Sequence, residues 1–74
     1  MGGIAFGRWL LTQADRRDWI AGLAKLARAD KSFPAEATPD ALRAHLSNAQ
    51  ADAELFEVLD DAELAWRAEL KRVA

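Results

Sequence analysis

The stretch Asp30-Lys31-Ser32-Phe33-Pro34 decides how this chain is expected to fold, because it ends one helical segment and anchors the loop after it. Proline cannot continue a helix, and it disfavours helical dihedrals in the residue before it. Phe33 is therefore expected to be extended, with its ring as an aromatic anchor. The stretch predicts a helix exit and a loop that reaches residue 38.

The segment before this exit has the pattern of an amphipathic helix, expected over residues 16–29 with Asp15 as its N-cap. Helical spacing divides the side chains between two faces. The face expected to be buried carries Trp19, Ile20, Leu23, Leu26 and Ala27. The opposite face carries Arg17, Ala21, Lys25 and Arg28. One side is therefore predicted to pack on a core, and the other to present a basic stripe.

The rest of the chain also reads as helix, since Ala, Leu, Glu, Arg and Lys dominate it. Further helices are expected over residues 5–13, 39–47, 51–59 and 62–72. Thr38 followed by Pro39 is a typical helix start, with the threonine as N-cap. Asp60 or Asp61 is expected to cap the last helix. No run alternates apolar and polar residues, so the predicted fold class is all-α, a compact bundle of four to five short helices.

Composition limits what this bundle can do. A chain of 74 residues is expected to form a single domain over residues 1–74. Apolar residues make up 51% of it, but many are alanines, so we expect one small core and no deep substrate cavity. An enzyme is therefore not expected. No cysteine is present, which excludes disulfides and thiolate metal sites.

Location is predicted by the same kind of argument. No stretch approaches the ~18 consecutive apolar residues of a membrane span, and the chain does not open with a signal-peptide pattern. We therefore expect a cytoplasmic protein without a membrane partner. The heavy use of Ala, Arg and Asp is typical of a GC-rich bacterial genome.

No residue group predicts catalysis or ligand binding. His45 is the only histidine and lies at the edge of an apolar stripe, where a structural or surface role is expected. Asp60, Asp61 and Glu63 form a carboxylate cluster, but helix capping explains it without a cation. We expect no catalytic, cofactor-binding or metal-binding residues, no cofactor and no small-molecule substrate.

Charge and one tryptophan point instead to an interaction surface. The net charge is −2, yet residues 1–46 carry +2 and residues 47–74 carry −4. Trp19 is expected to be half exposed in the first turn of its helix, and such tryptophans are common binding hot spots. The candidate surface comprises Arg17, Trp19, Lys25, Arg28 and Lys31, with Asp60 and Asp61 on the acidic side. Arg16 extends the basic group, and Asp52, Glu54 and Glu57 extend the acidic group.

Three interpretations use these residues. In the first, the basic face meets an acidic surface of a protein partner or of another copy of the chain, in a salt-sensitive contact. In the second, the same basic face binds nucleic acid, with Trp19 stacking on a base. In the third, the stripe is simply the solvated face of a helix. We expect a non-enzymatic protein-interaction module, with nucleic-acid binding as the alternative.

A set of positions spread along the chain resembles the YozE-like family of short bacterial proteins. The family pattern is an F-x-x-[WY]-L opening helix, an L-A helix ending in D-x-x-F-P, and a closing helix with aromatic residues. The matching positions are Phe6-Gly7-Arg8-Trp9-Leu10-Leu11, Ile20, Leu23-Ala24, Asp30, Phe33-Pro34, Leu46 and Trp66. The resemblance covers roughly residues 5–70 and implies a sterile-alpha-motif-like (SAM-like) helical fold.

The resemblance implies little about activity, because the family has no established biochemical function. SAM-like folds elsewhere mostly bind proteins, often by self-association, and some bind nucleic acid. The sequence also departs from the family pattern at several places. These are Ala21-Gly22 before the Leu-Ala pair, Leu26 in place of an acid, His45 in place of a tyrosine, and Glu63 in place of an aromatic residue.

Overall fold

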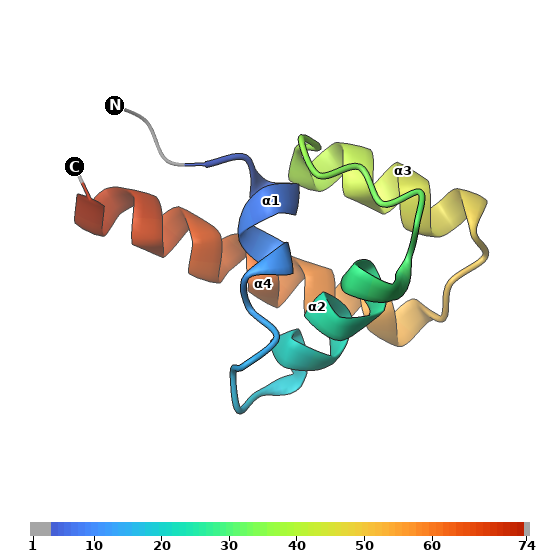
Figure 1. Ribbon diagram of the computed structural model, residues 1–74, viewed down its shortest axis with the longest axis horizontal. Helices are drawn as coiled ribbons and strands as arrows, with labels where there is room; N and C mark the ends of the chain where they lie inside the picture. Colours follow the sequence, from blue (N-terminus) through green and yellow to red (C-terminus); the bar gives the residue numbers. More distant parts are fainter. Residues whose placement is uncertain (1–3, 74) are drawn as a thin grey trace.

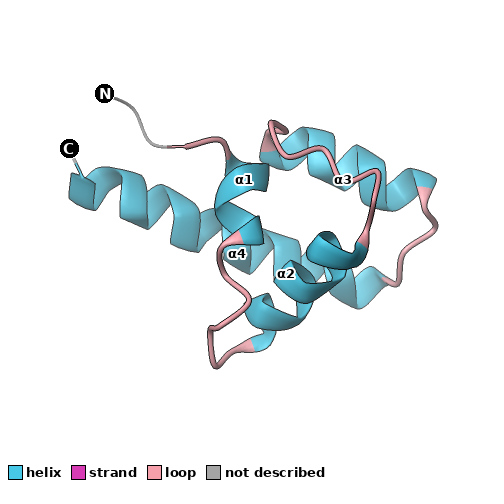
Figure 2. Ribbon diagram, viewed as in Figure 1, coloured by secondary structure: helices cyan, strands magenta, loops and turns pink. Residues whose placement is uncertain are grey.

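A computed structural model of the chain describes residues 4–73, with the side chains of residues 4–72. This part of the chain contains four α-helices and no strand, which confirms the all-α prediction (Figures 1 and 2). The helices are α1 (Phe6–Leu11), α2 (Trp19–Ala29), α3 (Pro39–Asn48) and α4 (Ala53–Val73). Helices α3 and α4 form an antiparallel hairpin, and the C-terminal turns of α4 extend past the other helices (Figure 1).

The last helix differs from the prediction. Residues 51–59 and 62–72 were expected to form two helices with a cap at Asp60 or Asp61, but α4 is one helix of 21 residues. At 1.5 Å per residue it is about 30 Å long. No glycine or proline interrupts this segment, and the buried stripe continues through Leu59 and Ala62. Both aspartates therefore lie inside the helix and cap nothing.

The start of α2 also differs from the prediction. Asp18 is the N-cap in place of Asp15, and its carboxylate accepts a hydrogen bond from the Ile20 backbone N–H at 3.1 Å. The helix therefore begins at Trp19, and Arg17 lies in the preceding loop. Asp15 and Asp18 are equally good cap residues, and the burial of Ile20 favours the later start.

The exit of α2 agrees with the prediction. The helix ends at Ala29, and Asp30 has an extended backbone. The Asp30 carboxylate accepts hydrogen bonds from both the backbone N–H and the hydroxyl of Ser32, each at 2.9 Å. Phe33 is half buried and packs against the core. The hydrogen bonds of Asp30 and the packing of Phe33 therefore both hold this loop in place.

This loop also sets how closely α1 can approach. The backbone N–H of Gly7 donates to Ala37 O at 3.1 Å. A Cβ atom on Gly7 would lie 2.6 Å from Pro34 O and 2.8 Å from Ala35 O, which is closer than real side chains come. Glycine is required here because the loop backbone packs directly on the helix. The loop that contains Phe33-Pro34 therefore packs directly against α1.

The core lies where α1 and α2 meet α4, and α3 closes it. Its members are Phe6, Trp9 and Leu10 of α1, Ile20, Leu23, Ala24 and Ala27 of α2, Ala37, Leu42 of α3, and Val58, Leu59 and Ala62 of α4. The rings of Phe6 and Trp66 meet edge to face, with centroids 5.4 Å apart. The predicted N-cap of α3 is confirmed, since Thr38 Oγ1 accepts from the Ala41 N–H at 3.2 Å.

The buried face of α2 is rotated from the predicted one. Ala21, expected in water, is buried, and Leu26, expected in the core, is 54% exposed. Trp19 is 47% exposed. The packed face combines the small side chains of Ala21, Ala24 and Ala27 with Ile20 and Leu23, so that the helix packs closely while Trp19 and Leu26 stay exposed.

Candidate interaction surface

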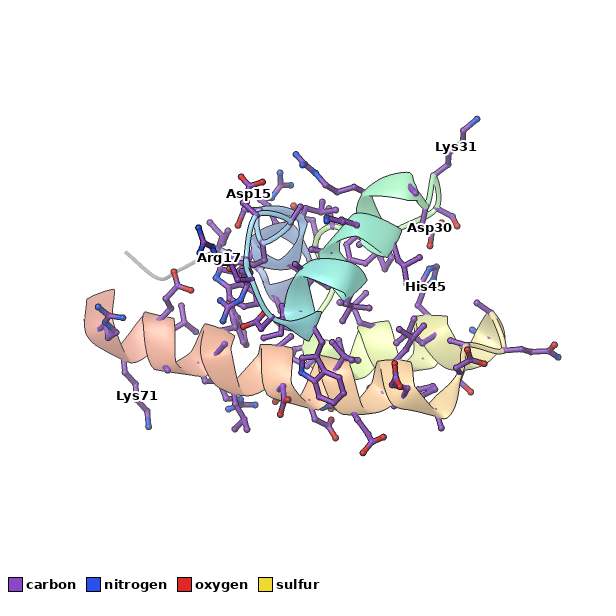
Figure 3. The ribbon with its side chains drawn as sticks, turned by 90° about the horizontal axis from the view of Figure 1, so that it is seen from below. Asp15, Arg17, Asp30, Lys31, His45 and Lys71 are labelled. Carbon is purple, nitrogen blue, oxygen red and sulfur yellow. The ribbon has the colours of Figure 1, made fainter. Side chains whose placement is uncertain are left out.

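The basic residues predicted to form one stripe are exposed but divided. Lys25 and Arg28 lie on α2, and Lys31 comes after the helix. Arg17 belongs to the loop between α1 and α2, before the helix begins. Figure 3 shows Lys31 far from it, at the other end of α2. Within the part of the chain that the structure describes, these four side chains form no ion pair with a carboxylate. We call Arg17, Lys25, Arg28 and Lys31 the basic surface.

Arg16 is not part of this surface. Its guanidinium donates to both carboxylate oxygens of Asp18, at 2.9–3.1 Å, and to Gln13 Oε1 at 3.1 Å. The hydrogen bond from Arg16 lowers the pKa of Asp18 below its ordinary value. Arg16 therefore stabilises the carboxylate that caps α2, and its charge is compensated within the molecule.

Two predicted site residues, Trp19 and Asp61, are brought together by the fold. The indole N–H of Trp19 donates to Asp61 Oδ2 at 2.8 Å and so joins the first turn of α2 to the middle of α4. The ring itself stays about half exposed. A carboxylate beside the ring suits a protein partner better than a nucleic-acid phosphate, because like charges repel.

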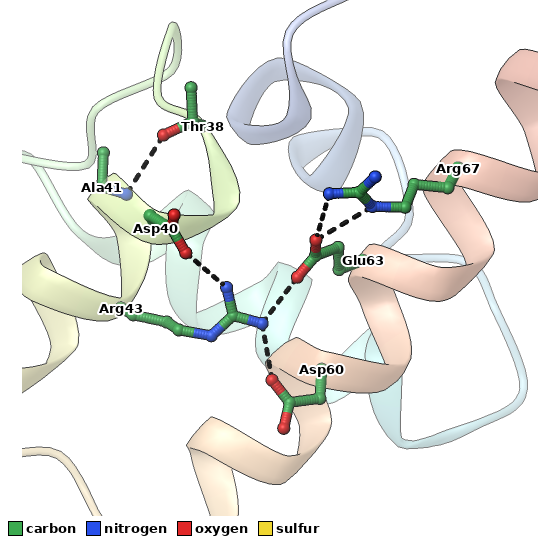
Figure 4. Close-up of polar contacts among 7 residues, drawn as sticks. All are labelled: Thr38, Asp40, Ala41, Arg43, Asp60, Glu63 and Arg67. Carbon is green, nitrogen blue, oxygen red and sulfur yellow. Dashed lines mark hydrogen bonds and ion pairs between the residues drawn. The ribbon is translucent and has the colours of Figure 1, made fainter.

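Asp60 points to the other side of α4, where it takes part in a charged cluster (Figure 4). Arg43 of α3 donates to Asp60 and Glu63 at 2.6 Å each, and to Asp40 at 3.1 Å. Glu63 also accepts from Arg67, one turn further along α4. Asp60 therefore helps to join α3 to α4. Of these two adjacent aspartates, only Asp61 lies on the α2 side of the helix.

The cluster changes how Glu63 titrates. Hydrogen bonds from Arg43 and then from Arg67 lower the pKa of Glu63.

The two partners of Arg43 across the helix interface lie 17 and 20 residues away in the chain. No pattern in the sequence singled out Arg43. Only its neighbour three residues back, Asp40, gave a local signal for an ion pair.

Four further acidic residues, just before α4 and along it, stay available. Asp52, Glu54, Glu57 and Asp61 are exposed and form no ion pair within residues 4–73. We call these four residues the acidic surface. Glu54, Glu57 and Asp61 are spaced three and four residues apart, so they share one face of α4. Leu64 continues this face and is 66% exposed.

An apolar cavity of about 70 Å³ lies between α2, α3, α4 and the Phe33 loop. Exposed Leu26 and half-buried Phe33, Leu46 and Leu55 surround its opening, and Leu10, Leu42 and Leu59 of the core lie beneath. His45 and Asp30 supply its polar edge, where His45 Nε2 donates to Asp30 Oδ2 at 2.8 Å (Figure 3). This hydrogen bond, together with those from Ser32, lowers the pKa of Asp30.

The part of the chain that the structure describes, residues 4–73, holds no group of three or more His, Asp and Glu side chains placed to hold a metal ion. Its helices include none that is long and apolar enough to cross a membrane. What the fold presents in this part is a small helical module with charged surfaces and an apolar cavity between α2, α3 and α4.

The comparison with protein families assigns this module. The model of the YozE SAM-like fold matches residues 5–67, so the chain belongs to the YozE family of SAM-like proteins. This confirms the resemblance seen in the sequence. No curated protein and no solved structure matches the chain.

The departures from the family pattern have identifiable places in the structure. Leu26 and His45 both line the apolar cavity. Glu63 belongs to the Arg43 cluster, and Ala21 packs in the interface of α2. Two of the unusual positions therefore shape the same cavity, although they lie on different helices.

Proposed function

We propose that this chain is a non-enzymatic protein-interaction module of the bacterial cytoplasm, which binds a protein partner or a second copy of itself through paired charges. The observation that carries the proposal is the division of its surface charge. The Arg43 cluster and the Arg16–Asp18 pair compensate charges within the fold. The basic surface and the acidic surface, by contrast, form no ion pairs within residues 4–73.

Electrostatics supports this use of the two surfaces. Charged groups at a protein surface attract an opposite charge by about 4 kcal/mol at 4 Å with an effective dielectric constant near 20. Much of that is offset by desolvation and side-chain ordering, so charge gives orientation and association rate more than affinity. The contact would weaken with salt, because the Debye length falls from about 10 Å at 0.1 M to about 3 Å at 1 M.

The size of the apolar cavity supports a non-enzymatic role. Its volume of about 70 Å³ is well below the ~300 Å³ at which pockets for small molecules begin, and the larger hollows along α4, of about 270 to 600 Å³, are more open to solvent. The polar groups at its edge, His45 and Asp30, are hydrogen-bonded to each other.

The test is affinity capture from a bacterial lysate at low salt, with and without nuclease, using wild type and Arg17→Glu/Arg28→Glu. A matched control, Lys71→Glu/Arg72→Glu, makes the same charge change on exposed residues of α4. We expect a defined protein that survives nuclease, binds wild type and the control, and is lost at high salt and with the first variant. Association that ignores both salt and Arg17→Glu/Arg28→Glu would contradict the proposal.

Nucleic-acid binding is the second candidate, and the uncompensated exposed bases Lys25, Arg28 and Lys31 favour it. It predicts that labelled single-stranded DNA or RNA binds with little sequence preference and a steep salt dependence. Anisotropy titrations of wild type and Arg17→Glu/Arg28→Glu test this directly. Nuclease-sensitive capture together with binding lost on charge reversal would favour this candidate over the first.

A further inference from the structure

We propose that the apolar cavity between α2, α3 and α4 is an anchor pocket for one aliphatic side chain, Leu64 of a second copy of this chain. The inference rests on the proposed function, since it names the partner and the apolar contact that would accompany charge pairing. It is carried by three observations: the size of the cavity, the position of Leu64, and the charges beside each.

The volume of the cavity selects its occupant. A cavity of about 150 Å³ holds a benzene ring, whereas a single water needs only about 10–15 Å³. At about 70 Å³ this cavity is smaller than one that holds a benzene ring and, being lined by leucines, is unsuited to water. The branched end of an aliphatic side chain fits both its size and its chemistry.

Leu64 is the exposed aliphatic residue available to fill it. The exposed large apolar side chains among the described residues are Ile4, Trp19, Leu26 and Leu64. Trp19 is too large, and Leu26 already forms part of the opening. Ile4 lies beside Trp66, whose indole N–H donates to the Ile4 carbonyl at 3.1 Å. Leu64 is the most exposed of the four, at 66%, and stands on the outer face of α4.

Charge complementarity pairs the two sites. Leu64 shares its helix face with Asp61 and Glu57, three and seven residues earlier, and both belong to the acidic surface. At the opening of the cavity, Leu26 lies on the same helix between Lys25 and Arg28. Seating Leu64 in the cavity therefore brings the acidic surface of one copy toward the basic surface of the other.

A chain cannot satisfy this contact by itself. Leu55 lines the cavity, and Leu64 lies nine residues further along the same straight helix, about 14 Å away along its axis. After one contact has formed, one copy therefore keeps an unfilled pocket and the other copy keeps an unused Leu64. Such a contact between different surfaces adds copies head to tail.

The test uses sedimentation velocity at low salt over a range of concentrations, on the full chain. Leu64→Gln removes the anchor and Leu26→Gln alters the pocket opening; both positions are exposed, so circular dichroism should show unchanged folding. Ile4→Gln is the matched control, an exposed aliphatic residue outside the contact. We expect wild type and the control to form species larger than dimers, and each of the other variants to associate about tenfold or more weakly.

Mixing the two variants gives the sharpest result. Leu64→Gln keeps an intact pocket and Leu26→Gln keeps an intact anchor, so an equimolar mixture retains one working contact. We expect it to form a dimer and nothing larger. A mixture that stays monomeric, or a Leu64→Gln variant that associates like wild type, would overturn the inference, as would a wild type that stays monomeric throughout.

Failure of this inference is separable from failure of the proposed function. If Lys25→Glu/Arg28→Glu abolishes self-association and Leu64→Gln does not, charge pairing stands and the anchor is wrong. If Leu64→Gln abolishes it and charge reversal and salt have no effect, the anchor stands and charge pairing is wrong. A monomeric wild type that still captures another protein by its basic surface overturns only the anchor.

Discussion

The two sides of α4 use charge in opposite ways. On the side of α3, Arg43 binds Asp60 and Glu63 directly, and the charges hold two helices together (Figure 4). On the side of α2, Asp61 meets only the indole N–H of Trp19 among the described residues, and the basic residues of α2 stay in solvent. Two adjacent aspartates in the same helix thus serve different purposes.

This difference indicates which side chains can be substituted without unfolding the protein. Leu42 on α3 is almost completely buried, whereas Leu26 on α2 is 54% exposed beside a cavity. Side chains on the α3 side therefore contribute mainly to stability. The exposed side chains on the α2 side, such as Leu26, contribute little to it and are free to take part in binding. This separation can be measured with pairs of matched substitutions.

The largest effect is expected from a pair of leucines. Leu42→Ala should lower the free energy of unfolding by about 2–4 kcal/mol, because a fully buried side chain is lost and a cavity remains. Leu26→Ala should lower it by less than about 0.5 kcal/mol. Urea denaturation followed by tryptophan fluorescence measures both. Equal losses would show that the two sides of α4 do not differ as described.

The loss at Leu42 is large in relation to the whole protein. At about 0.05–0.15 kcal/mol per residue, a chain of 74 residues has a total stability of roughly 4–11 kcal/mol. Leu42→Ala should therefore leave a measurable unfolded population at the lower end of that range, and this should appear as a fall in the thermal midpoint.

A pair of arginines tests the charges themselves. Arg43→Gln should destabilise by about 1–2 kcal/mol, because Asp60 and Glu63 lose their shared partner and repel each other. Arg28→Gln should change stability by less than about 0.5 kcal/mol, since no ion pair is lost among the described residues. Chemical denaturation at low salt and at about 0.5 M salt measures both, and added salt should reduce the Arg43 effect. A larger loss at Arg28 would reverse the comparison.

Acid should weaken the contact between α3 and α4 that Glu63 makes. Arg43 and Arg67 lower the pKa of Glu63, so its carboxylate stabilises the fold above the ordinary glutamate pKa of about 4.3. This contribution is lost as the pH falls through the lowered pKa, because the unfolded chain binds the proton more readily. Stability of wild type and Glu63→Gln should therefore differ at about pH 7 and converge below about pH 4. A constant difference across that range would contradict the assignment.

These two sides also separate what the sequence could predict from what it could not. The Thr38 cap and the Phe33-Pro34 exit depend on neighbouring residues, and both were predicted correctly. The position of Arg43 between Asp60 and Glu63 depends on how α3 lies on α4, which no local pattern encodes. The Trp19–Asp61 hydrogen bond spans 42 residues for the same reason.

The wrong helix boundaries have a related cause. Asp60 and Asp61 are good cap residues, so local preference favoured a break that the continuous buried stripe of α4 overrode. At the start of α2 two aspartates offered the same capping chemistry, and packing chose the later one. The capping preferences of the aspartates therefore indicated the possible helix boundaries, and the burial of apolar side chains determined which boundaries the fold has.

Among the contacts that join helices, the smallest effect of a substitution is expected at Trp19, which within residues 4–73 joins α2 to α4 through the charge of Asp61. Trp19→Phe removes the indole N–H donor and keeps an aromatic ring, and because Asp61 can turn to water, stability should fall by only about 0.5 kcal/mol. Trp19→Phe in an Asp61→Ala background should show little further loss, since the pair acts as one unit. Thermal denaturation of this double-mutant cycle measures it. A coupling above about 2 kcal/mol would mean that Trp19 stabilises the fold in the way that Arg43 does, and that the α2 side is less available for binding than its exposure indicates.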